Sequence, residues 1–308
     1  MRLKRFAAQL FAALLPVSPL GAETLIRPPL DVDLVGELRS VPAAGEDTLL
    51  DIARRFDAGQ DEILHANPDV DRWLPKPGSQ VLVPSRHILP DARREGLILN
   101  IAEMRLYYFP PSRPGQPDEL QTYPVSIGRM DWDTPQGTTR VIAKTRNPEW
   151  RPPESIKEEH AADGEPLPDV VPAGPDNPLG KYALRLGLPG YLIHSTNKPY
   201  GVGMRVTHGC VRMYPEDIEQ LFPEVPVGTP VQIVNQPVKV GWLGHTLFIE
   251  IHPPLEEDQD RINLQHLAMD MVNREWERRP FTLDGGALNR AIEARNGIPV
   301  AIAHEKME

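Results

Sequence analysis

The stretch YLIHSTNKPYGVGMRVTHGCVRM, residues 191–213, joins two short segments of strand character through a glycine-containing turn. The first segment is apolar and ends on His194, and the second begins directly after Cys210. Glycines between them allow backbone conformations that other residues resist. The pattern predicts that His194 projects from a rigid strand toward a turn that carries the Cys210 thiol.

Further strand candidates lie on both sides of this stretch. They are apolar segments bounded by turn residues, at residues 97–101, 104–109, 122–127, 138–145, 182–186 and 230–234. Short strands with turn signals and little helical periodicity between them predict a mostly-β domain of the sandwich or barrel-like kind. We expect this domain, the candidate catalytic domain, to span residues 96–235.

A proline-rich stretch, residues 147–178, interrupts the strand pattern. A loop of this length inside a compact domain usually serves as a lid or a binding loop, or is disordered. Its length and its prolines therefore predict a lid over the site. Residues 215–222 read as a short helix, with proline in the first turn and acidic residues near its start.

The segment before the β domain reads as a small unit of its own, at residues 38–85. Its order is strand, helix, helix, strand. Asp47 and Thr48 can cap a first helix, since apolar residues follow at helical spacing. Asp61 can start a second helix, which Asn67-Pro68 ends. This order of segments predicts a βααβ module.

The two ends of the chain differ in character. Residues 1–22 combine basic residues, a short apolar run and small residues, which predicts a cleavable export signal. The run is too short to span a membrane, and the mature chain has no other long apolar run. The C-terminal extension, residues 236–308, reads as a hairpin at 241–251 followed by helices at 261–278 and 285–296.

Composition excludes some function classes. The chain has 308 residues and a formal net charge of −10. A nucleic-acid-binding protein needs a basic patch, and none stands out, so we expect no nucleic-acid partner. The single cysteine, Cys210, cannot form an internal disulfide. In an exported chain such a thiol is a candidate reactive group.

The residue types around Cys210 favour nucleophilic catalysis. A thiol becomes a useful nucleophile when an imidazole takes its proton or stabilises the thiolate. His194 and His208 are both available, and His208 can instead orient the loop. Zinc held by the two histidines and the thiolate is the alternative use. The spacing matches no recognised zinc signature, and no metal is expected.

The spacing of these residues resembles a known family. His194, a dozen intervening residues, and then Thr207-His-Gly-Cys210 is the signature of YkuD-type L,D-transpeptidases. Gly128 and the strings at 177–184, 193–197 and 213–217 support the resemblance, which spans residues 96–235. The module at 38–85 resembles a LysM glycan-binding unit. The whole order of segments looks like the periplasmic subgroup that anchors Braun-type lipoprotein to peptidoglycan.

The resemblance implies a role for several residues. Cys210 would be the nucleophile and His194 the proton acceptor and donor, with the Ser195 carbonyl orienting the imidazole. His208 and Gly209 would shape the loop, and N–H groups near Gly209 and Cys210 would form the oxyanion hole. The family requires neither cofactor nor metal.

Arg212 departs from the pattern, since many members carry asparagine there. Its guanidinium is a candidate to hold a carboxylate of the anionic stem peptide, and the alternative is a structural ion pair. Tyr182, Asn197, Tyr200 and Trp150 are further candidates for lining the substrate groove.

The implied reaction is two-step acyl transfer on peptidoglycan stems in the periplasm. Cys210 would attack the amide after the third residue of a tetrapeptide stem, and D-alanine would leave. The thioester would pass to an amine, either a lysine of an envelope lipoprotein or the side-chain amine of a second stem. Water as acceptor would make the enzyme an L,D-carboxypeptidase. A non-catalytic wall-binding protein is the alternative from another class.

Overall fold

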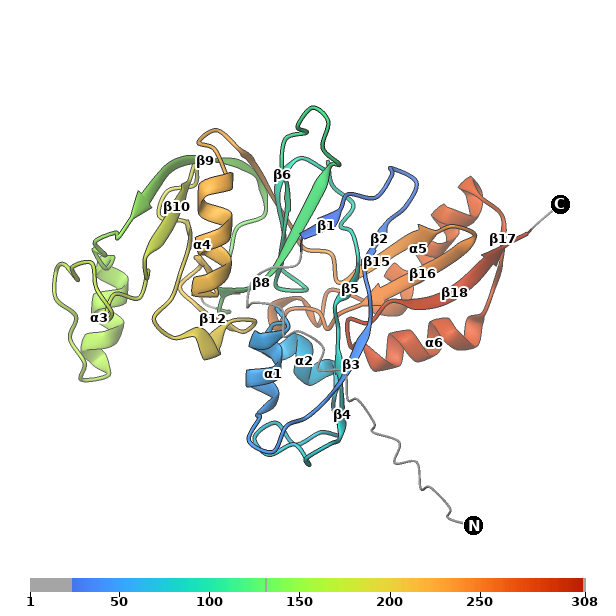
Figure 1. Ribbon diagram of the computed structural model, residues 1–308, viewed down its shortest axis with the longest axis horizontal. Coiled ribbons are helices and arrows are strands. Elements are labelled where there is room, and N and C mark those ends of the chain that lie inside the picture. The colour runs from blue at the N-terminus through green and yellow to red at the C-terminus, as the bar shows by residue number, and fades with distance from the viewer. Residues whose placement is uncertain (1–23, 131, 307–308) are drawn as a thin grey trace, which may run out of the picture.

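The computed structural model describes residues 24–130 and 132–306, and it arranges them as three packed bodies. In Figure 1 a β barrel forms the upper part, the N-terminal module lies below it, and the C-terminal extension lies to its right. The expected export signal at residues 1–22 falls outside the described residues. Within those described, no helix has the length and apolar character needed to cross a lipid bilayer.

The N-terminal module contains β3 (Arg39–Pro42), α1 (Leu49–Arg55), α2 (Gln60–Ala66) and β4 (Gln80–Val83), in the order that the sequence predicts. Thr48 caps α1 through a reciprocal capping box with Asp51, which satisfies backbone donors at the helix start. The strands β3 and β4 pair antiparallel, and Leu49, Ile52 and Ile63 are buried between helices and strands.

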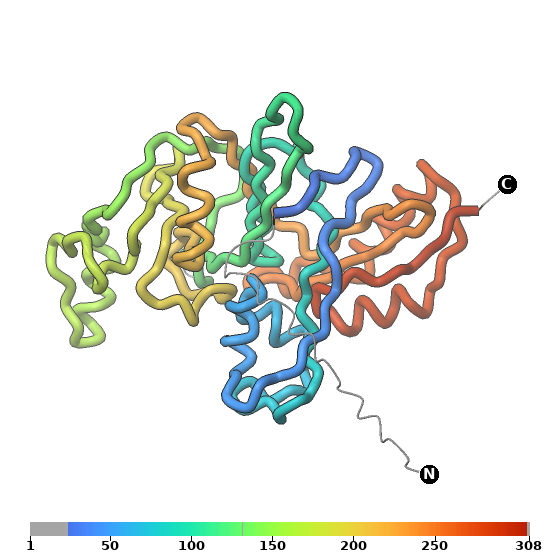
Figure 2. The backbone as a smooth tube through the Cα atoms, in the orientation of Figure 1, coloured from blue at the N-terminus to red at the C-terminus, as the bar shows by residue number. Residues whose placement is uncertain are grey.

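Three short strands flank the module and were missed from the sequence. They are β1 (Thr24–Ile26), β2 (Leu34–Gly36) and β5 (Arg86–Ile88). β1 joins the edge of the barrel sheet through β8, and β2 pairs with β5. Strands of three residues carry too little alternation to be read from a sequence. Figure 2 follows this N-terminal segment from the barrel down into the module.

A closed ring of strands forms the barrel. Its members are β8 (Glu119–Gly128), β13 (Val211–Met213), β11 (Leu192–His194), β10 (Tyr182–Leu186), β9 (Gly137–Arg146), β14 (Pro230–Val234), β6 (Gly96–Asn100) and β7 (Arg105–Phe109). They are joined in this order, and pairing of β7 with β8 closes the ring. β12 (Arg205–Thr207) adds to β8 in parallel. The expected mostly-β, barrel-like domain is confirmed, including strands at every predicted position.

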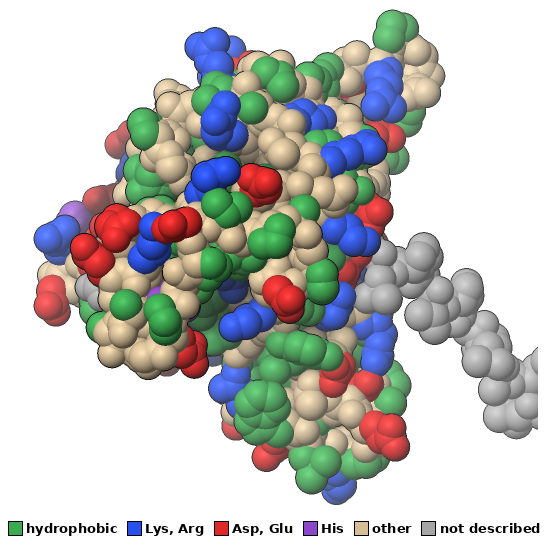
Figure 3. Space-filling view, turned by 90° about the vertical axis from the view of Figure 1, so that its left-hand side faces the viewer, with side chains coloured by type: hydrophobic (Ala, Val, Ile, Leu, Met, Phe, Trp, Pro, Cys, Tyr) green, Lys and Arg blue, Asp and Glu red, His purple; other side chains and the backbone are tan. Residues whose placement is uncertain are grey.

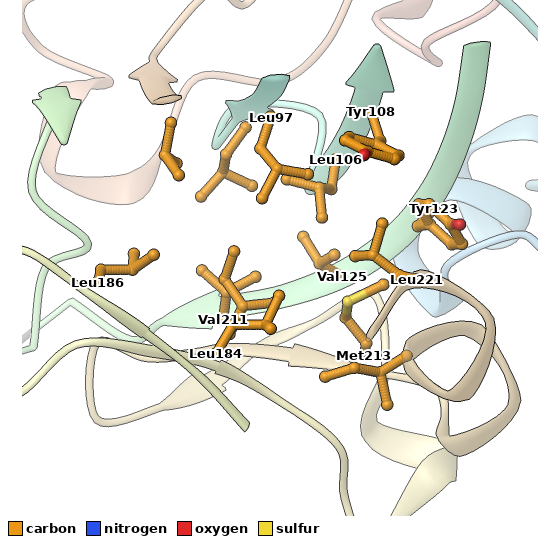
Figure 4. Packing of buried hydrophobic residues seen from close by; sticks show 14 of the residues in the cluster. Leu97, Leu106, Tyr108, Tyr123, Val125, Leu184, Leu186, Val211, Met213 and Leu221 are labelled. Carbon is orange, nitrogen blue, oxygen red and sulfur yellow. The ribbon is translucent and has the colours of Figure 1, made fainter. Parts of the chain in front are cut away.

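The barrel interior is the main hydrophobic core. Leu97, Tyr108, Val125, Leu184 and Val211 contribute to it from five different strands, and Figure 4 shows their side chains converging between the strands. Burial of apolar surface at about 25 cal/mol per Å² makes such a core the main source of stability. A rigid barrel wall thereby fixes the strands that carry the functional residues.

Two helices leave the barrel strands. α4 (Pro215–Glu224) follows β13 directly and packs Ile218 and Leu221 into the core, as predicted for residues 215–222. α3 (Glu154–Ala162) lies within the proline-rich stretch, where the sequence predicts loop alone. Prolines 152 and 153 precede the helix rather than interrupt it, and proline is tolerated at a helix start. In Figure 1 α3 lies at the far left edge of the molecule.

The C-terminal extension is more ordered than expected. β15 (Val238–Leu243), β16 (Thr246–Ile251), β18 (Val300–Glu305) and β17 (Phe281–Leu283) form a four-stranded sheet in this order. α5 (Leu264–Arg278) and α6 (Gly285–Ala294) match the two predicted helices and pack against this sheet around a separate core. The last two strands were not predicted.

A buried charge cluster joins the barrel, the C-terminal extension and strand β5. Nζ of Lys239 lies 2.6 Å from Glu103 and 2.8 Å from Glu250, and all three side chains are almost fully buried. Glu250 also contacts the backbone N–H of Ile88, in the strand that follows the module, at 2.5 Å. Burial opposes the charged ammonium, but the two carboxylates outweigh it and raise the pKa of Lys239.

Candidate active site

Strand register places the histidine, the cysteine and Arg212 on one face of the barrel wall. β11 and β13 are parallel neighbours, and His194 stands opposite Arg212. Cys210 lies two residues before Arg212, and in an extended chain such residues point to the same face. The Cys210 thiol and the His194 imidazole therefore come from adjacent strands, one step apart along the wall.

The His194 imidazole is held in one orientation. Its Nδ1 lies 2.6 Å from the backbone carbonyl of Ser195. A carbonyl only accepts, so Nδ1 carries the proton and Nε2 is left as the basic nitrogen. Burial, and then the positive charge of Arg212, lower the pKa of His194 to about 3. The imidazole is therefore neutral at physiological pH, as a general base requires.

The Cys210 thiol is also neutral at rest. Burial raises its pKa, and the backbone N–H of Leu192 and the charge of Arg212 oppose that effect. Sγ lies 3.6 Å from the carbonyl oxygen of Gly190, which is its hydrogen-bond acceptor. In the described chain no hydrogen bond joins Sγ to His194. Catalytic hydrogen bonds are often made only when substrate is bound, and a rotation about one side-chain bond redirects the thiol.

The turn before Cys210 has a shape that only glycine permits. Gly209 has φ +93°, and a Cβ there would lie 2.9 Å from the ring of Tyr191. The hydroxyl of Thr134 donates to the Gly209 carbonyl at 3.0 Å, and that of Thr207 donates to the Cys210 carbonyl at 2.6 Å. These contacts fix the backbone on both sides of the thiol.

His208 contacts α3 rather than the thiol. Its Nε2 lies 3.0 Å from a carboxylate oxygen of Glu159 on α3, and its ring meets Trp132 edge-on at 5.1 Å between centroids. Glu159 also pairs with Arg129. His208 thus connects the cysteine loop to α3, and Glu159, Arg129 and Trp132 are partners that the sequence did not reveal. Glu159 is 49 residues away from His208, and no motif links them.

A cavity of about 530 Å³ contains the candidate residues. Its lining includes Cys210, His194, His208 and Arg212. Four Lys or Arg side chains but only two carboxylates line it: Arg151, Arg185, Lys198 and Arg212 against Glu149 and Asp176. Figure 3, which views the side on which α3 lies, shows a hollow with Lys and Arg side chains near its rim. The cavity is basic although the chain is acidic, so it favours an anionic ligand.

Of the four predicted groove residues, two line the cavity and two do not. Trp150 and Asn197 belong to the lining. Tyr182 packs its ring on Phe222 of α4, with centroids 4.9 Å apart, because its side chain leaves the opposite face of β10. Tyr200 is 58% exposed and lies in the short 3-10 helix Pro199–Gly201. Neither tyrosine belongs to the lining of this cavity. Arg185 and Lys198 were missed.

The proline-rich stretch forms one wall of the cavity. Trp150 pairs with Val171 across the stretch, and the buried Asn177 donates to the carbonyls of Pro148, Val171 and Pro172 at 2.8, 3.3 and 3.1 Å. This amide ties both ends of the stretch together. It is thus an ordered flap with a helix rather than a bare loop.

The N-terminal module supports the loop between the histidine and the cysteine. Backbone N–H groups of Gln60 and Asp61, at the start of α2, donate to the carbonyls of Val202 and Gly203 at 3.0 Å each. Gly59 and Gly203 meet so closely that a Cβ on Gly59 would lie 2.9 Å from Gly203. The free N–H groups of a helix start are therefore satisfied by the loop that leads to Cys210.

The described residues do not form the zinc site considered as an alternative. Within them, the one group of histidine, cysteine and acidic side chains close enough to hold a metal is His87, Glu103 and Glu250. That group already contains the Lys239 ammonium between its carboxylates. A larger cavity, about 790 Å³, lies between the C-terminal extension and residues 30–33 and 89–94, apart from the thiol.

Comparison with known proteins finds relatives of this chain among L,D-transpeptidases. Residues 94–233 match the YkuD family, described as the L,D-transpeptidase catalytic domain. The chain is 39% identical to "Probable L,D-transpeptidase YbiS" of Escherichia coli strain K12, covering 98% of this chain and 99% of the relative. It is 38% identical to "Probable L,D-transpeptidase YcfS" of the same organism, covering 98% and 94%. Among solved structures it is similar to L,D-transpeptidase 3 of Mycobacterium tuberculosis, at 19% identity, 65% and 82% coverage and a TM-score of 0.33.

Proposed function

Because the chain belongs to the YkuD family of L,D-transpeptidases, we propose that its Cys210 thiol accepts the acyl group of a stem peptide and that His194 moves the proton. The chain is a peptidoglycan L,D-transpeptidase, and the assignment of residues, donor and acceptor is our proposal. The observation that carries it is the parallel pairing of β11 with β13, which brings His194 and Cys210 to one cavity.

The first step forms the acyl-enzyme. Nε2 of His194 takes the proton of Sγ while sulfur bonds to the carbonyl carbon of the third residue of a tetrapeptide stem. The bond from that carbon to the nitrogen of D-alanine then breaks, and His194 returns the proton to the leaving nitrogen. A neutral thiol and a neutral imidazole are enough for this step, because the proton moves from sulfur to Nε2 as the carbon–sulfur bond forms.

The oxyanion is stabilised by backbone N–H groups at the turn before the nucleophile. We assign this role to the N–H groups of Gly209 and Cys210, because the contact of Thr134 with the Gly209 carbonyl holds the peptide unit that carries the Cys210 N–H, and the contact of Thr207 with the Cys210 carbonyl holds the next unit. Each such donor contributes about 3 kcal/mol in comparable acyl-transfer sites.

The second step releases the acyl group to an acceptor. An amine attacks the thioester carbon and gives its proton to His194, the carbon–sulfur bond breaks, and the thiolate is protonated again. The amine is a lysine of an envelope lipoprotein or the side-chain amine of another stem. Water in its place would give L,D-carboxypeptidase activity, as the second candidate.

Trp150 and Asn197 line the groove in this proposal. Trp150 lies in the flap, and the side chain of Asn197 donates to the carbonyl of Asp176 at the end of the flap, at 3.2 Å. Both connect the flap to the space in front of Cys210. Tyr182 and Tyr200 have no role in this proposal, because they do not belong to the lining of the cavity.

The N-terminal module is proposed to bind peptidoglycan glycan, as its resemblance to LysM units implies. Trp73 and Leu74, in the loop after α2, are 62% and 72% exposed, and an exposed aromatic ring is suited to stack on a sugar. Binding of peptide-free glycan strands that is lost in Trp73→Ala, but kept in Trp276→Ala on the extension, would support this role.

The site of action is proposed to be the periplasm, after removal of an export signal at residues 1–22. The substrates lie outside the cytoplasmic membrane, and the basic, apolar and small residues at the start of the chain support export. Envelope fractionation of the tagged full-length chain tests this assignment, and retention in the cytoplasm would contradict it.

The test of the reaction uses purified tetrapeptide muropeptides with an acceptor peptide ending in lysine, with a second muropeptide, or with neither. Mass spectrometry separates anchoring, 3→3 crosslinking and hydrolysis. We expect release of D-alanine by the wild type and its loss, by several orders of magnitude, in Cys210→Ala and His194→Ala. His266→Ala, an exposed histidine on α5, is the matched control. Full activity of Cys210→Ala would refute the assignment.

A further inference from the structure

Arg212 is a cation without a counter-charge. Its Nε is buried and makes no hydrogen bond to any described residue, and no described carboxylate lies within ion-pair distance of its guanidinium. Burial lowers the pKa of Arg212, and Cys210 is the acidic group that acts against this. A buried charge is costly unless it is paired, so an ion pair within the chain does not explain this residue.

Three other arginines of the described chain that are at least partly shielded from water are paired. Arg105 binds Glu62 at 2.6 Å, Arg205 binds Glu257 at 2.7 Å, and Arg54 binds Glu216 through two contacts. Arg212 differs from them in one more respect, since it lines the cavity that contains Cys210. Its missing partner is therefore to be sought in a ligand of that cavity.

The position of Arg212 indicates which part of the ligand it meets. His194 must return a proton to the leaving nitrogen, so that nitrogen lies beside the imidazole when the amide breaks. Arg212 stands directly opposite His194 in the strand register. In a donor that ends one residue after the scissile bond, the terminal carboxylate is two bonds from this nitrogen.

We propose that Arg212 binds the terminal carboxylate of the leaving amino acid and so makes the enzyme select donors that end one residue after the scissile bond. This inference rests on the proposed function, because it needs Cys210 and His194 to act on the same amide. Two parallel N–H groups of a guanidinium match the two oxygens of a carboxylate. A donor with an additional residue carries an amide at that point and leaves the cation unpaired.

Arg185 lies on β10, the strand beyond the one that carries His194. It is exposed on β10 opposite Leu192, it lines the same cavity, and no described residue pairs with it. It is two strands away from β13, which follows Cys210 and contains Arg212, and its register partner is Leu192 rather than His194. It therefore serves as a matched control, because it is a cation of the same cavity that does not stand opposite His194.

The test compares two tetrapeptide donors that differ only in a free or an amidated C-terminus. The wild type should use the free acid with a kcat/KM roughly 10–100-fold above that of the amide, since a hydrogen bond to a charged group has about this effect. In Arg212→Ala the two donors should become nearly equal, Arg212→Lys should keep part of the preference, and Arg185→Ala should keep all of it.

Binding to the Cys210→Ala protein, measured by calorimetry with the same two peptides, gives a readout without turnover. Tighter binding of the acid, lost when Arg212→Ala is added, supports the inference. Equal kcat/KM for acid and amide in the wild type, or an equal loss on both donors in a folded Arg212→Ala protein, would overturn it. If the wild type releases neither D-alanine from the free acid nor D-alaninamide from the amide, the proposed function is refuted, and this inference with it.

Discussion

The cluster around Lys239 and the cavity around Arg212 each keep a cation away from bulk water, but their surroundings differ. Lys239 has two carboxylates at 2.6 and 2.8 Å, whereas the Nε of Arg212 has no partner within the described chain. The cation of the first arrangement has its partners within the folded protein, and the cation of the second finds one only in a ligand. The shielded charge of Lys239 therefore stabilises the fold, whereas that of Arg212 is available to bind a ligand.

The largest expected effect comes from breaking the complete cluster. Lys239→Met should lower the free energy of unfolding by about 3–5 kcal/mol, because it leaves two buried carboxylates without their cation. Denaturant unfolding measures it. Lys157→Met removes a lysine that pairs with carboxylates at the surface and should change nothing measurable. A Lys239→Met protein as stable as the wild type would show that the cluster does not hold the extension and the barrel together.

A third arrangement uses a proton in place of a cation. Asp57 of the module and Asp217 of α4 are both buried, and one oxygen of each has no partner. Burial raises the pKa of Asp57 from 3.8 to about 7, and burial together with Asp57 raises the pKa of Asp217. The folded protein therefore retains a proton here that the unfolded chain loses.

Stability from this pair should be fully present below about pH 4 and should be lost as pH rises toward 7, at up to about 1.4 kcal/mol per pH unit for one proton. Asp217→Asn should flatten this part of the stability curve, since one titrating carboxyl is gone. Chemical denaturation at three pH values in that window is the measurement. Parallel curves for the variant and the wild type would rule out the shared proton.

A smaller effect is expected where the charges are paired but exposed. Glu159→Gln weakens the contacts of α3 with His208 and Arg129. We expect faster amide hydrogen exchange in Glu154–Ala162 with little change in global stability, because exposed pairs contribute little. Glu158→Gln, the exposed neighbour, is the control. Unchanged exchange in Glu159→Gln would mean that α3 is held by packing alone.

The smallest effect is expected when Arg212 is replaced and no substrate is present. Arg212→Ala should not reduce stability, since no ion pair is lost, and it should raise the pKa of His194 by removing one of the two causes that lower it. Burial, the larger cause, remains, so the imidazole should still titrate below 6.5. NMR titration of the ring measures this, with Arg185→Ala as control. A drop in the pKa would show that the two side chains are not electrostatic neighbours.

Much of the fold could be predicted because the signals are local. The strands at 182–186 and 230–234 have the predicted bounds, and Thr48 caps α1 as its residue type suggests. The last two strands of the extension could not be recognised, since β18 is formed by pairing with β16, about fifty residues earlier, and β17 by pairing with β18. α3 was hidden because its prolines read as loop signals, although they stand before the helix.

The site was predictable in its residue types and less so in its partners. The spacing of His194 and Cys210 singles them out, and the register of β11 with β13 places both on one face. The contact of His208 with Glu159 arises from tertiary packing and leaves no trace in spacing. Arg185 and Tyr182 lie three residues apart in the same strand, and only the register decides that the arginine faces the cavity.

The seat of the His194–Cys210 loop on α2 has a consequence for how the enzyme would meet its polymer. The two hydrogen bonds from Gln60 and Asp61 fasten the module to this loop. A glycan strand gripped by the module would present its peptides to the thiol from one fixed direction and at one fixed reach. The spacing of modified stems along a glycan strand would then follow the helical pitch of the sugar chain, because the distance from the module to Cys210 is fixed.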